Sequence, residues 1–280
     1  MAKLNFTKMH GAGNDYIYVN CFQHTMENPS ELAVKLSDRH FGIGSDGLVL
    51  ILPSQIADIR MQMFNSDGSE AEMCGNASRC VGKYAYDNGL TDKTQISLET
   101  KAGIKYITLL EGDEKTRKVT VDMGEPILDA KEIPVVANES PVLNLQLTID
   151  GKVWRMTCVS MGNPHAVTFM NGISGLDLPK MGPKFEKNVA FPKKTNTEFA
   201  EVVDRKTLNM RVWERGAGET LACGTGACAT TVAAILNGLT DRKITLHLLG
   251  GDLEVEWKEA DNRVYMTGEA VTVFNGEIEI

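Results

Sequence analysis

The stretch Asn88-Gly89-Leu90-Thr91-Asp92 recurs unchanged as Asn237-Gly238-Leu239-Thr240-Asp241, 149 residues further along the chain. The same offset places Cys74-Gly75 on Cys223-Gly224 and needs no gap over 34 positions, of which 10 are identical. A period this long exceeds the roughly 20–50 residues of a solenoid unit. The repeat therefore predicts two related domains, each carrying one cysteine at the same place.

The length of the chain agrees with two domains, because a single core seldom grows beyond ~250–300 residues and the chain has 280. We expect a first repeat domain at residues 1–125, joined by residues 271–280 as a returning strand. The second repeat domain is expected at residues 126–270, with the active site in the cleft between the two.

Each half combines many short strand-like segments with one long helix, at about Gly75–Asn88 and Gly224–Asn237. Both helices end in Asn-Gly, where glycine can take the left-handed conformation that closes a helix. Near the C-terminus, Val264–Thr267 and Ala270–Phe274 are expected as separate strands. The pattern predicts an α+β fold of two pseudo-symmetric domains, each a β-barrel-like sheet around a central buried helix.

The charge and composition of the chain argue against several classes of protein. The net charge of −8 and the pI near 5.3 argue against nucleic acid or an anionic membrane as a partner. The longest apolar runs, near Leu48–Leu52 and Val232–Leu236, are far shorter than the ~20 residues of a membrane span. The first residues lack the apolar core of a signal peptide, so a cytoplasmic protein is expected. Six cysteines are too few for a disulfide scaffold.

Both repeats place Cys-Gly where a loop passes into the long helix. Free N–H groups and the helix dipole make such a point a site for anions, so a substrate carboxylate is expected there. The same position is expected to lower the pKa of the thiol and make it a usable general base. The duplicated context singles out Cys74 and Cys223 as catalytic. The other cysteines are predicted to be small buried residues: Cys21, Cys80, Cys158 and Cys228.

Other uses of the cysteines fit the sequence less well. Cys74 and Cys80, and likewise Cys223 and Cys228, are separated by five and four residues and lie along helices, which is unlike a structural zinc site. The glycines around Thr225 are not followed by the Gly-Lys-Ser/Thr of a phosphate loop. Neither a metal nor a cofactor is predicted.

Two further places carry polar residues close to the repeat. His165 follows Gly162-Asn163, which the offset places on Gly13-Asn14, although a histidine that opens a strand can also be a purely structural residue. Glu214-Arg215 falls where the first half has Asn65-Ser66. Each of these pairs ends a strand, nine residues before its cysteine.

At these residues the chain resembles the diaminopimelate epimerases, cofactor-independent enzymes of bacterial and plant lysine synthesis. The resemblance runs the full length of the chain. Its motifs are His10-Gly11-Ala12-Gly13-Asn14-Asp15, Arg39-His40-Phe41-Gly42-Ile43-Gly44, Phe64–Asn76, Gly162-Asn163-Pro164-His165, Trp213–Thr220 and Cys223-Gly224-Thr225-Gly226.

The resemblance implies a role for each of these positions. Cys74 and Cys223 would be the two acid/base thiols, and His165 and Glu214 would flank them and adjust their pKa. A side-chain ligand of some members is absent here, because Gly47 occupies its position. The implied substrate-binding residues are Asn14, Asn65, Gly75, Asn76, Asn163, Asn196, Glu214, Arg215, Gly224 and Thr225.

The predicted function is the interconversion of L,L-diaminopimelate and meso-diaminopimelate for lysine and peptidoglycan precursor synthesis. One thiol removes the α-proton from one face while the other protonates the opposite face. The partners expected are the small-molecule substrate and a second copy of the chain in a homodimer. Two alternatives stay open: a proline or hydroxyproline racemase-type isomerase, and a non-catalytic thiol-sensing binding protein.

Overall fold

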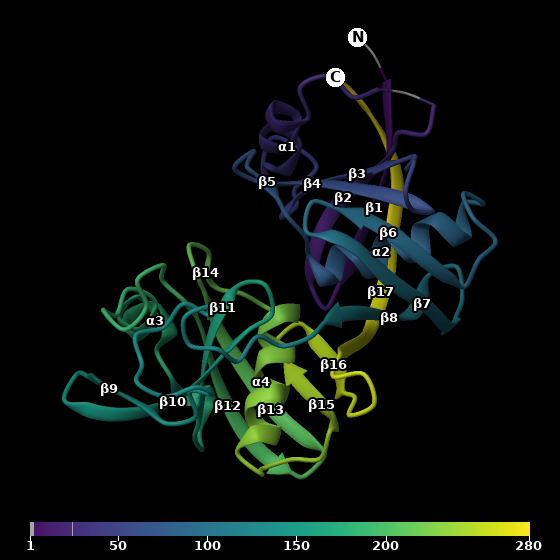
Figure 1. The fold of residues 1–280 in the computed structure, drawn as a ribbon. Coiled ribbons are helices and arrows are strands. Elements are labelled where there is room, and N and C mark those ends of the chain that lie inside the picture. Colours follow the sequence, from purple (N-terminus) through teal and green to yellow (C-terminus); the bar gives the residue numbers. More distant parts are fainter. Residues whose placement is uncertain (1–2, 24) are drawn as a thin grey trace. The chain divides into compact units, whose positions relative to one another are not determined.

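The computed structural model describes residues 3–23 and 25–280, which form two compact units (Figure 1). The first unit contains the residues up to Asp122 together with Thr267–Ile280, and the second contains Met123–Met266. The chain leaves the first unit within strand β8 (Thr116–Gly124) and returns within strand β17 (Val264–Glu279).

Eight strands of the described part of the first unit close into a barrel. The hydrogen-bonded order is β1-β2-β3-β4-β6-β7-β8-β17, and β17 pairs back with β1. A two-residue strand, β5 (Glu70–Ala71), adds to β4. The remaining strands of this unit are β1 (Lys3–Gly11), β2 (Asn14–Asn20), β3 (Gly47–Leu52), β4 (Ile59–Asn65), β6 (Gln95–Thr100) and β7 (Gly103–Gly112).

Helix α2 (Gly75–Asp87) occupies the centre of the first unit and contacts β1, β2, β6 and β7. Its residues from Gly75 to Ala85 are all buried, as expected for a helix enclosed by a sheet. The helix ends at Asp87, Asn88 is its C-cap, and Gly89 follows with φ 66°. The predicted helix and its glycine stop are therefore confirmed. A second helix, α1 (Pro29–Ser37), packs against β3 and β4.

The second unit repeats this plan. Its strands follow the order β10-β11-β12-β13-β15-β16 with the same alternation of antiparallel and parallel pairs as β1-β2-β3-β4-β6-β7. Even the register is repeated, since Tyr16 pairs with Gly47 and His165 pairs with Asn196. The strands are β9 (Leu145–Ile149), β10 (Lys152–Ser160), β11 (Pro164–Phe169), β12 (Asn196–Asp204), β13 (Thr207–Glu214), β14 (Gly218–Glu219), β15 (Lys243–Leu248) and β16 (Gly251–Trp257).

Helix α4 (Gly224–Leu236) is the counterpart of α2 and contacts β10, β11, β12 and β16. Helix α3 (Leu178–Glu186) packs against β12 and β13 as α1 packs against β3 and β4. A short 3-10 turn, η1 (Ile173–Gly175), precedes α3. The predicted α+β fold of two pseudo-symmetric repeats, each a sheet curled around a buried helix, is confirmed.

The structure differs from the sequence-based expectation at the C-terminus. Val264–Thr267 and Ala270–Phe274, expected as two strands, are parts of the single strand β17. Gly268-Glu269 between them keeps an extended backbone, because β17 pairs with β8 and with β1. In the described part of the chain, no helix combines the length and the apolar character that crossing a membrane requires.

Candidate active site

Cys74 is the residue that precedes the first turn of α2. Its backbone is extended, with φ −136° and ψ 123°, and Gly75 begins the helix. The Cys74 side chain is partly exposed. The N–H groups of the first helical turn have no partner within the helix, so the amides of Gly75 and Asn76 lie where an anion can be held.

Two asparagine amides lie against this thiol. The Cys74 thiol donates to Oδ1 of Asn14 at 3.4 Å, and Nδ2 of Asn76 donates to the same oxygen at 3.4 Å. On its other side, Asn76 accepts a hydrogen bond of 2.9 Å from Arg79, whose side chain is fully buried. The structure therefore brings Asn14 and Asn76 to Cys74, together with a cation that the sequence did not single out.

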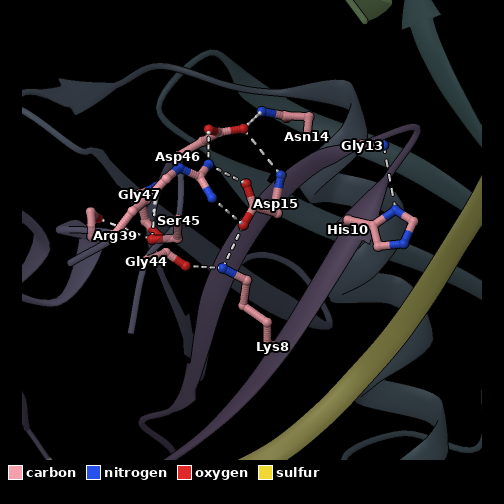
Figure 2. A network of polar contacts seen from close by, with 11 residues as sticks. Lys8, His10, Gly13, Asn14, Asp15, Arg39, Gly44, Ser45, Asp46 and Gly47 are labelled. Atoms are coloured by element: carbon pink, nitrogen blue, oxygen red, sulfur yellow. Dashed lines mark hydrogen bonds and ion pairs between the residues drawn. The ribbon is translucent and has the colours of Figure 1, made fainter. Parts of the chain in front are cut away.

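A network of charged side chains continues from Asn14 (Figure 2). Nδ2 of Asn14 donates to Oδ2 of Asp46 at 2.8 Å, and Arg39 donates to Asp46 at 3.0 Å and to Asp15 at 2.8 Å. The buried Lys8 pairs with Asp15 at 2.5 Å and donates to the carbonyl of Gly44. Burial alone would raise the pKa of Asp15, but hydrogen bonds from Arg39 and Lys8 outweigh it, and the pKa of Asp15 is lowered.

Gly47 begins β3 at the edge of this network. A Cβ at this position would lie 2.1 Å from the carbonyl oxygen of Phe64 and 2.9 Å from the ring of Tyr16. The close approach of the neighbouring strand leaves room only for glycine. A side-chain ligand at this position is therefore sterically excluded in this chain.

Cys223 precedes α4 as Cys74 precedes α2, but its surroundings differ. Its sulfur accepts a hydrogen bond from the N–H of Gly226 at 3.3 Å and lies 3.5 Å from the hydroxyl of Thr225. Burial raises the pKa of the Cys223 thiol well above its usual range, and the carboxylates of Glu214 and Glu198 raise it further. The lowered pKa expected at a helix N-terminus is therefore wrong for Cys223, because burial and the two carboxylates outweigh the hydrogen bonds from the helix.

Glu214 contributes directly to this environment. Burial raises the pKa of its carboxyl group, while hydrogen bonds from Thr220 and Cys223 partly oppose that shift. The hydroxyl of Thr220 donates to Oε1 at 2.5 Å. The Cys223 thiol thus lies next to a carboxyl group that binds protons more readily than an exposed glutamate does.

His165 is fully buried and engages both ring nitrogens. Nδ1 lies 2.6 Å from Oε1 of Glu198, and Nε2 lies 3.0 Å from Oδ1 of Asn163. Asn163 in turn donates to the hydroxyl of Thr225 at 3.3 Å. A chain of polar contacts therefore runs from Glu198 through His165, Asn163 and Thr225 to the sulfur of Cys223.

The sequence did not single out Glu198, although it carries a signal. The side chain is fully buried, and its Oε2 has no hydrogen-bond partner within residues 3–23 and 25–280. A glutamate is almost never fully buried unless it is paired. Here it interrupts the strand segment Asn196–Ala200, all of whose residues are buried. A lone charge inside a strand of this kind indicates an internal partner, which is His165.

The other predicted substrate-binding side chains, Asn65, Asn196 and Arg215, form hydrogen bonds within their own units. Nδ2 of Asn65 donates to the hydroxyl of Ser69 at 3.0 Å. Asn196 is buried, donates to the carbonyl of Pro164 at 2.8 Å and accepts from the backbone N–H of Arg215 at 2.9 Å. The guanidinium of Arg215 donates to the carbonyl of Lys193 at 3.1 Å. Asn196 thereby fixes the loop that carries Arg215.

The two thiol sites share geometry but differ in charge. Arg79 beside the first site corresponds in the repeat to Cys228, and Glu198 beside the second corresponds to Val49. The first site therefore includes a buried cation and the second a buried carboxylate. Across the described residues, no group of three or more His, Cys, Asp or Glu side chains is arranged to hold a metal ion.

Comparison with known proteins assigns a family to this arrangement. The family model described as diaminopimelate epimerase matches residues 6–128 and 157–273. A diaminopimelate epimerase of Acetivibrio thermocellus is 62% identical over 277 residues, covering 99% of both chains. One from Methanococcus maripaludis is 60% identical, covering 99% of this chain and 100% of its own.

Solved structures with this fold are more distant in sequence. A phenazine biosynthesis protein of the PhzF family from Bacillus anthracis aligns over 100% of both chains with a TM-score of 0.70 and 17% identity. A probable proline racemase from Agrobacterium radiobacter aligns over 99% of this chain and 93% of its own, with a TM-score of 0.69 and 15% identity. At this level of identity the likeness concerns the fold alone.

Proposed function

Because this chain belongs to the diaminopimelate epimerase family, we propose that Cys74 and Cys223 are the paired acid and base of its reaction. The observation that carries the assignment is the repeat itself. Each thiol occupies the same place in its own unit, directly before a buried helix whose first N–H groups can hold an anion. No other cysteine of the chain is duplicated in this way.

The chemistry requires the two thiols to be in opposite protonation states. One sulfur, as thiolate, removes the α-proton of diaminopimelate, and the other, as thiol, gives a proton to the opposite face of the same carbon. The raised pKa of Cys223 supports its role as the proton donor in the resting enzyme. Glu214 and Glu198 favour that protonated form, and His165 belongs to the chain of contacts that holds Glu198.

Helix N-termini and amides stabilise the charge that develops on the substrate. Backbone N–H groups aimed at a developing anion are among the strongest catalytic contributions in a site that excludes water. The proposed substrate contacts are the amides of Gly75, Gly224 and Thr225 and the side chains of Asn14, Asn65, Asn76, Asn163, Asn196, Glu214 and Arg215. A substrate with an amino-acid group at each end explains why so many of these side chains are amides.

Solvent deuterium distinguishes two bases from one. In heavy water, the donor thiol exchanges its hydrogen with solvent before it protonates the substrate. The earliest product from L,L-diaminopimelate is then expected to carry deuterium at the inverted carbon, while recovered substrate carries almost none. A single base would return its hydrogen to either face, so equal early label in substrate and product would overturn the assignment.

The cysteine variants are the matched controls for this experiment. Cys74→Ala and Cys223→Ala are each expected to abolish epimerisation, because inversion needs both an acid and a base. Cys228→Ala, in the same helix as the Cys223 site, removes a buried thiol without removing an acid or base. Near wild-type turnover by either catalytic variant would contradict the two-thiol mechanism.

The same proposal extends to the assembly and the compartment. We infer that the enzyme is a homodimer, and exposed apolar side chains on one face of β7 support this: Ile104, Tyr106 and Leu110. We also propose that it is cytoplasmic, where the reducing environment disfavours disulfide formation.

A further inference from the structure

The orientation of the Asn14 side-chain amide is fixed by one group that can only accept hydrogen bonds and by another that can only donate them. A carboxylate such as Asp46 can only accept, so Asn14 must turn its Nδ2 toward it, at 2.8 Å. The guanidinium of Arg79 can only donate, so Asn76 turns its Oδ1 toward Arg79 and its Nδ2 toward Asn14. Both constraints leave Oδ1 of Asn14 facing the sulfur of Cys74, at 3.4 Å.

Asp46 is itself firmly placed (Figure 2). Its carboxylate accepts from Arg39 at 3.0 Å and from the backbone N–H of Asp15 at 3.1 Å, as well as from Asn14. Its own backbone N–H donates to the carbonyl of Asp15 at 2.7 Å. Two cations, Lys8 and Arg39, balance the two carboxylates of this network.

We propose that Asp46 is a positioning residue for Cys74, which acts by fixing the Asn14 amide so that an acceptor, and not a donor, faces the thiol. An acceptor takes the S–H hydrogen, sets its direction and stabilises the neutral thiol relative to the thiolate. The inference rests on the proposed role of Cys74 as an acid/base thiol and adds the group that governs its ionisation.

Two titratable groups that act on Cys74 do not change charge near neutral pH. Tyr18 on β2 and Cys80 on α2 both interact electrostatically with Cys74. Burial raises the pKa of Tyr18 well above its usual value and that of Cys80 to about 11. Arg79 reaches the thiol through Asn76 and stays charged. The orientation of the Asn14 amide, in contrast, decides whether an acceptor or a donor faces the thiol.

An aspartate that orients an asparagine amide is found beside Cys74 and not beside Cys223. The offset of 149 residues places Asp46 on Thr195, whose hydroxyl donates to the carbonyl of Asn196 at 2.9 Å. Asn163, the counterpart of Asn14, bonds instead to Thr225 and His165. Cys223 is governed by carboxylates beside it, whereas Cys74 is governed by a carboxylate acting through an amide.

The test uses Asp46→Asn in a Cys223→Ala background, with alkylation of Cys74 by iodoacetamide followed against pH by peptide mass spectrometry. Oδ2 of Asp46 accepts from both Asn14 and the N–H of Asp15, so an amide at this position either turns its NH₂ group toward these donors or offers them a neutral oxygen in place of a charged one. In both cases Nδ2 of Asn14 is held less firmly, and an Asn14 amide that turns over presents a donor to the sulfur, which favours the thiolate. The midpoint of the alkylation profile is expected to move down by roughly one pH unit, the shift that corresponds to one hydrogen bond exchanged.

Two controls separate positioning from a general structural effect. Asp113→Asn removes the same charge from an exposed turn of the same unit and is expected to leave the midpoint in place. With Asn14→Ala already present, Asp46→Asn is expected to add no further shift, because its effect passes through the missing amide. An unchanged midpoint in Asp46→Asn, or an equal shift with and without Asn14, would overturn the inference.

Should Asp46→Asn fail to fold, Asn14→Ala alone decides. Loss of the acceptor is expected to lower the midpoint, and an unchanged or higher midpoint would contradict the proposal. Alkylation reports on the thiol without turnover. Its outcome is therefore independent of whether diaminopimelate is the substrate.

Discussion

At Cys223 two carboxylates act on one sulfur. Glu214 and Glu198 each raise the pKa of the thiol beyond the effect of burial, because a nearby negative charge opposes formation of the thiolate. Hydrogen bonds from Gly226 and Thr225 act in the opposite direction and are weaker. The pKa of this thiol is therefore raised by its burial and its neighbours, in spite of its place before the helix.

Glu214→Gln removes one of these charges while keeping an acceptor for Thr220. The pKa of Cys223 is expected to fall, so in a Cys74→Ala background alkylation of Cys223 should begin at lower pH. Turnover of the otherwise native enzyme is expected to drop by at least about tenfold, less than the ~10²–10⁴ that loss of an acid or base costs. Glu198→Gln should move the alkylation profile in the same direction, whereas a rise after either change would contradict this account.

The sequence predicted part of this site. The duplicated Cys-Gly and Gly-Asn pairs lead to Cys74, Cys223, Asn14 and Asn163, because the repeat marks positions that both units share. The sequence does not predict a role in the site for Glu198, Asp46 or Arg79. The partners of these residues are distant in sequence and come close only in the folded chain. Glu198 contacts His165 because β11 and β12 pair in parallel. The local sequence of neither strand predicts that pairing.

Helices and strands are predicted well from the sequence where the residues that begin and end them lie within the segment itself. The sequence predicts the bounds of helices α2 and α4 to within a residue or two, because a Cys-Gly start and an Asn-Gly stop lie at the ends of each segment. Helices α1 and α3 are only nine residues long, and each carries proline in its first turn, so neither has the length that distinguishes a helix from other short apolar segments. Two strands are expected in place of β17 because Gly268-Glu269 repeats the Gly124-Glu125 that closes the first repeat, whereas the observed strand continues through these residues.

The first turn of α4 shows how an element adapts to its site. A Cβ on Gly226 would lie 2.8 Å from Oε1 of Glu198 and 3.2 Å from the sulfur of Cys223. The corresponding residue of α2 is Ala77, which faces no such carboxylate because Val49 stands in place of Glu198. Gly226 is thus required by the carboxylate and not by the helix.

Gly226→Ala is expected to separate activity from stability. The methyl group displaces Glu198 or Cys223, so kcat/KM should fall at least about tenfold. The melting temperature should change little, because a gain of ~0.5–1 kcal/mol from helix propensity offsets the crowding. Ala77→Gly is the mirror control and should lower the melting temperature with a smaller effect on kcat/KM. Full activity of Gly226→Ala would show that the contact is tolerated.

At the scale of the whole molecule, the repeat preserves backbone and diverges in charge. Strand order, pairing sense and even the Tyr16–Gly47 and His165–Asn196 registers are duplicated. The charged groups are not: Arg79 and Asp46 occur only in the first unit, and Glu198 and Glu214 only in the second. The repeated backbone places the two thiols equivalently, and the charged groups around each thiol differ.

The exposed apolar side chains of β7 allow the oligomeric state of the protein to be tested. Side chains alternate between the faces of a strand, so Ile104, Tyr106 and Leu110 lie on one face of β7, where they are 39%, 57% and 41% exposed. If this face is the dimer contact, light scattering should give twice 30.7 kDa for the native chain. Tyr106→Glu, which places a charge on this face, should give a single chain.

Val153→Glu is the matched control for this experiment, because it charges an equally exposed apolar residue, 56% exposed, on β10 of the other unit. It is expected to remain a dimer, since burying a charge without a partner is costly only where the face is covered. Dissociation by Val153→Glu but not by Tyr106→Glu would move the contact to the second unit. A native mass near 30.7 kDa would show that the enzyme is a monomer and that these apolar side chains stay exposed to water.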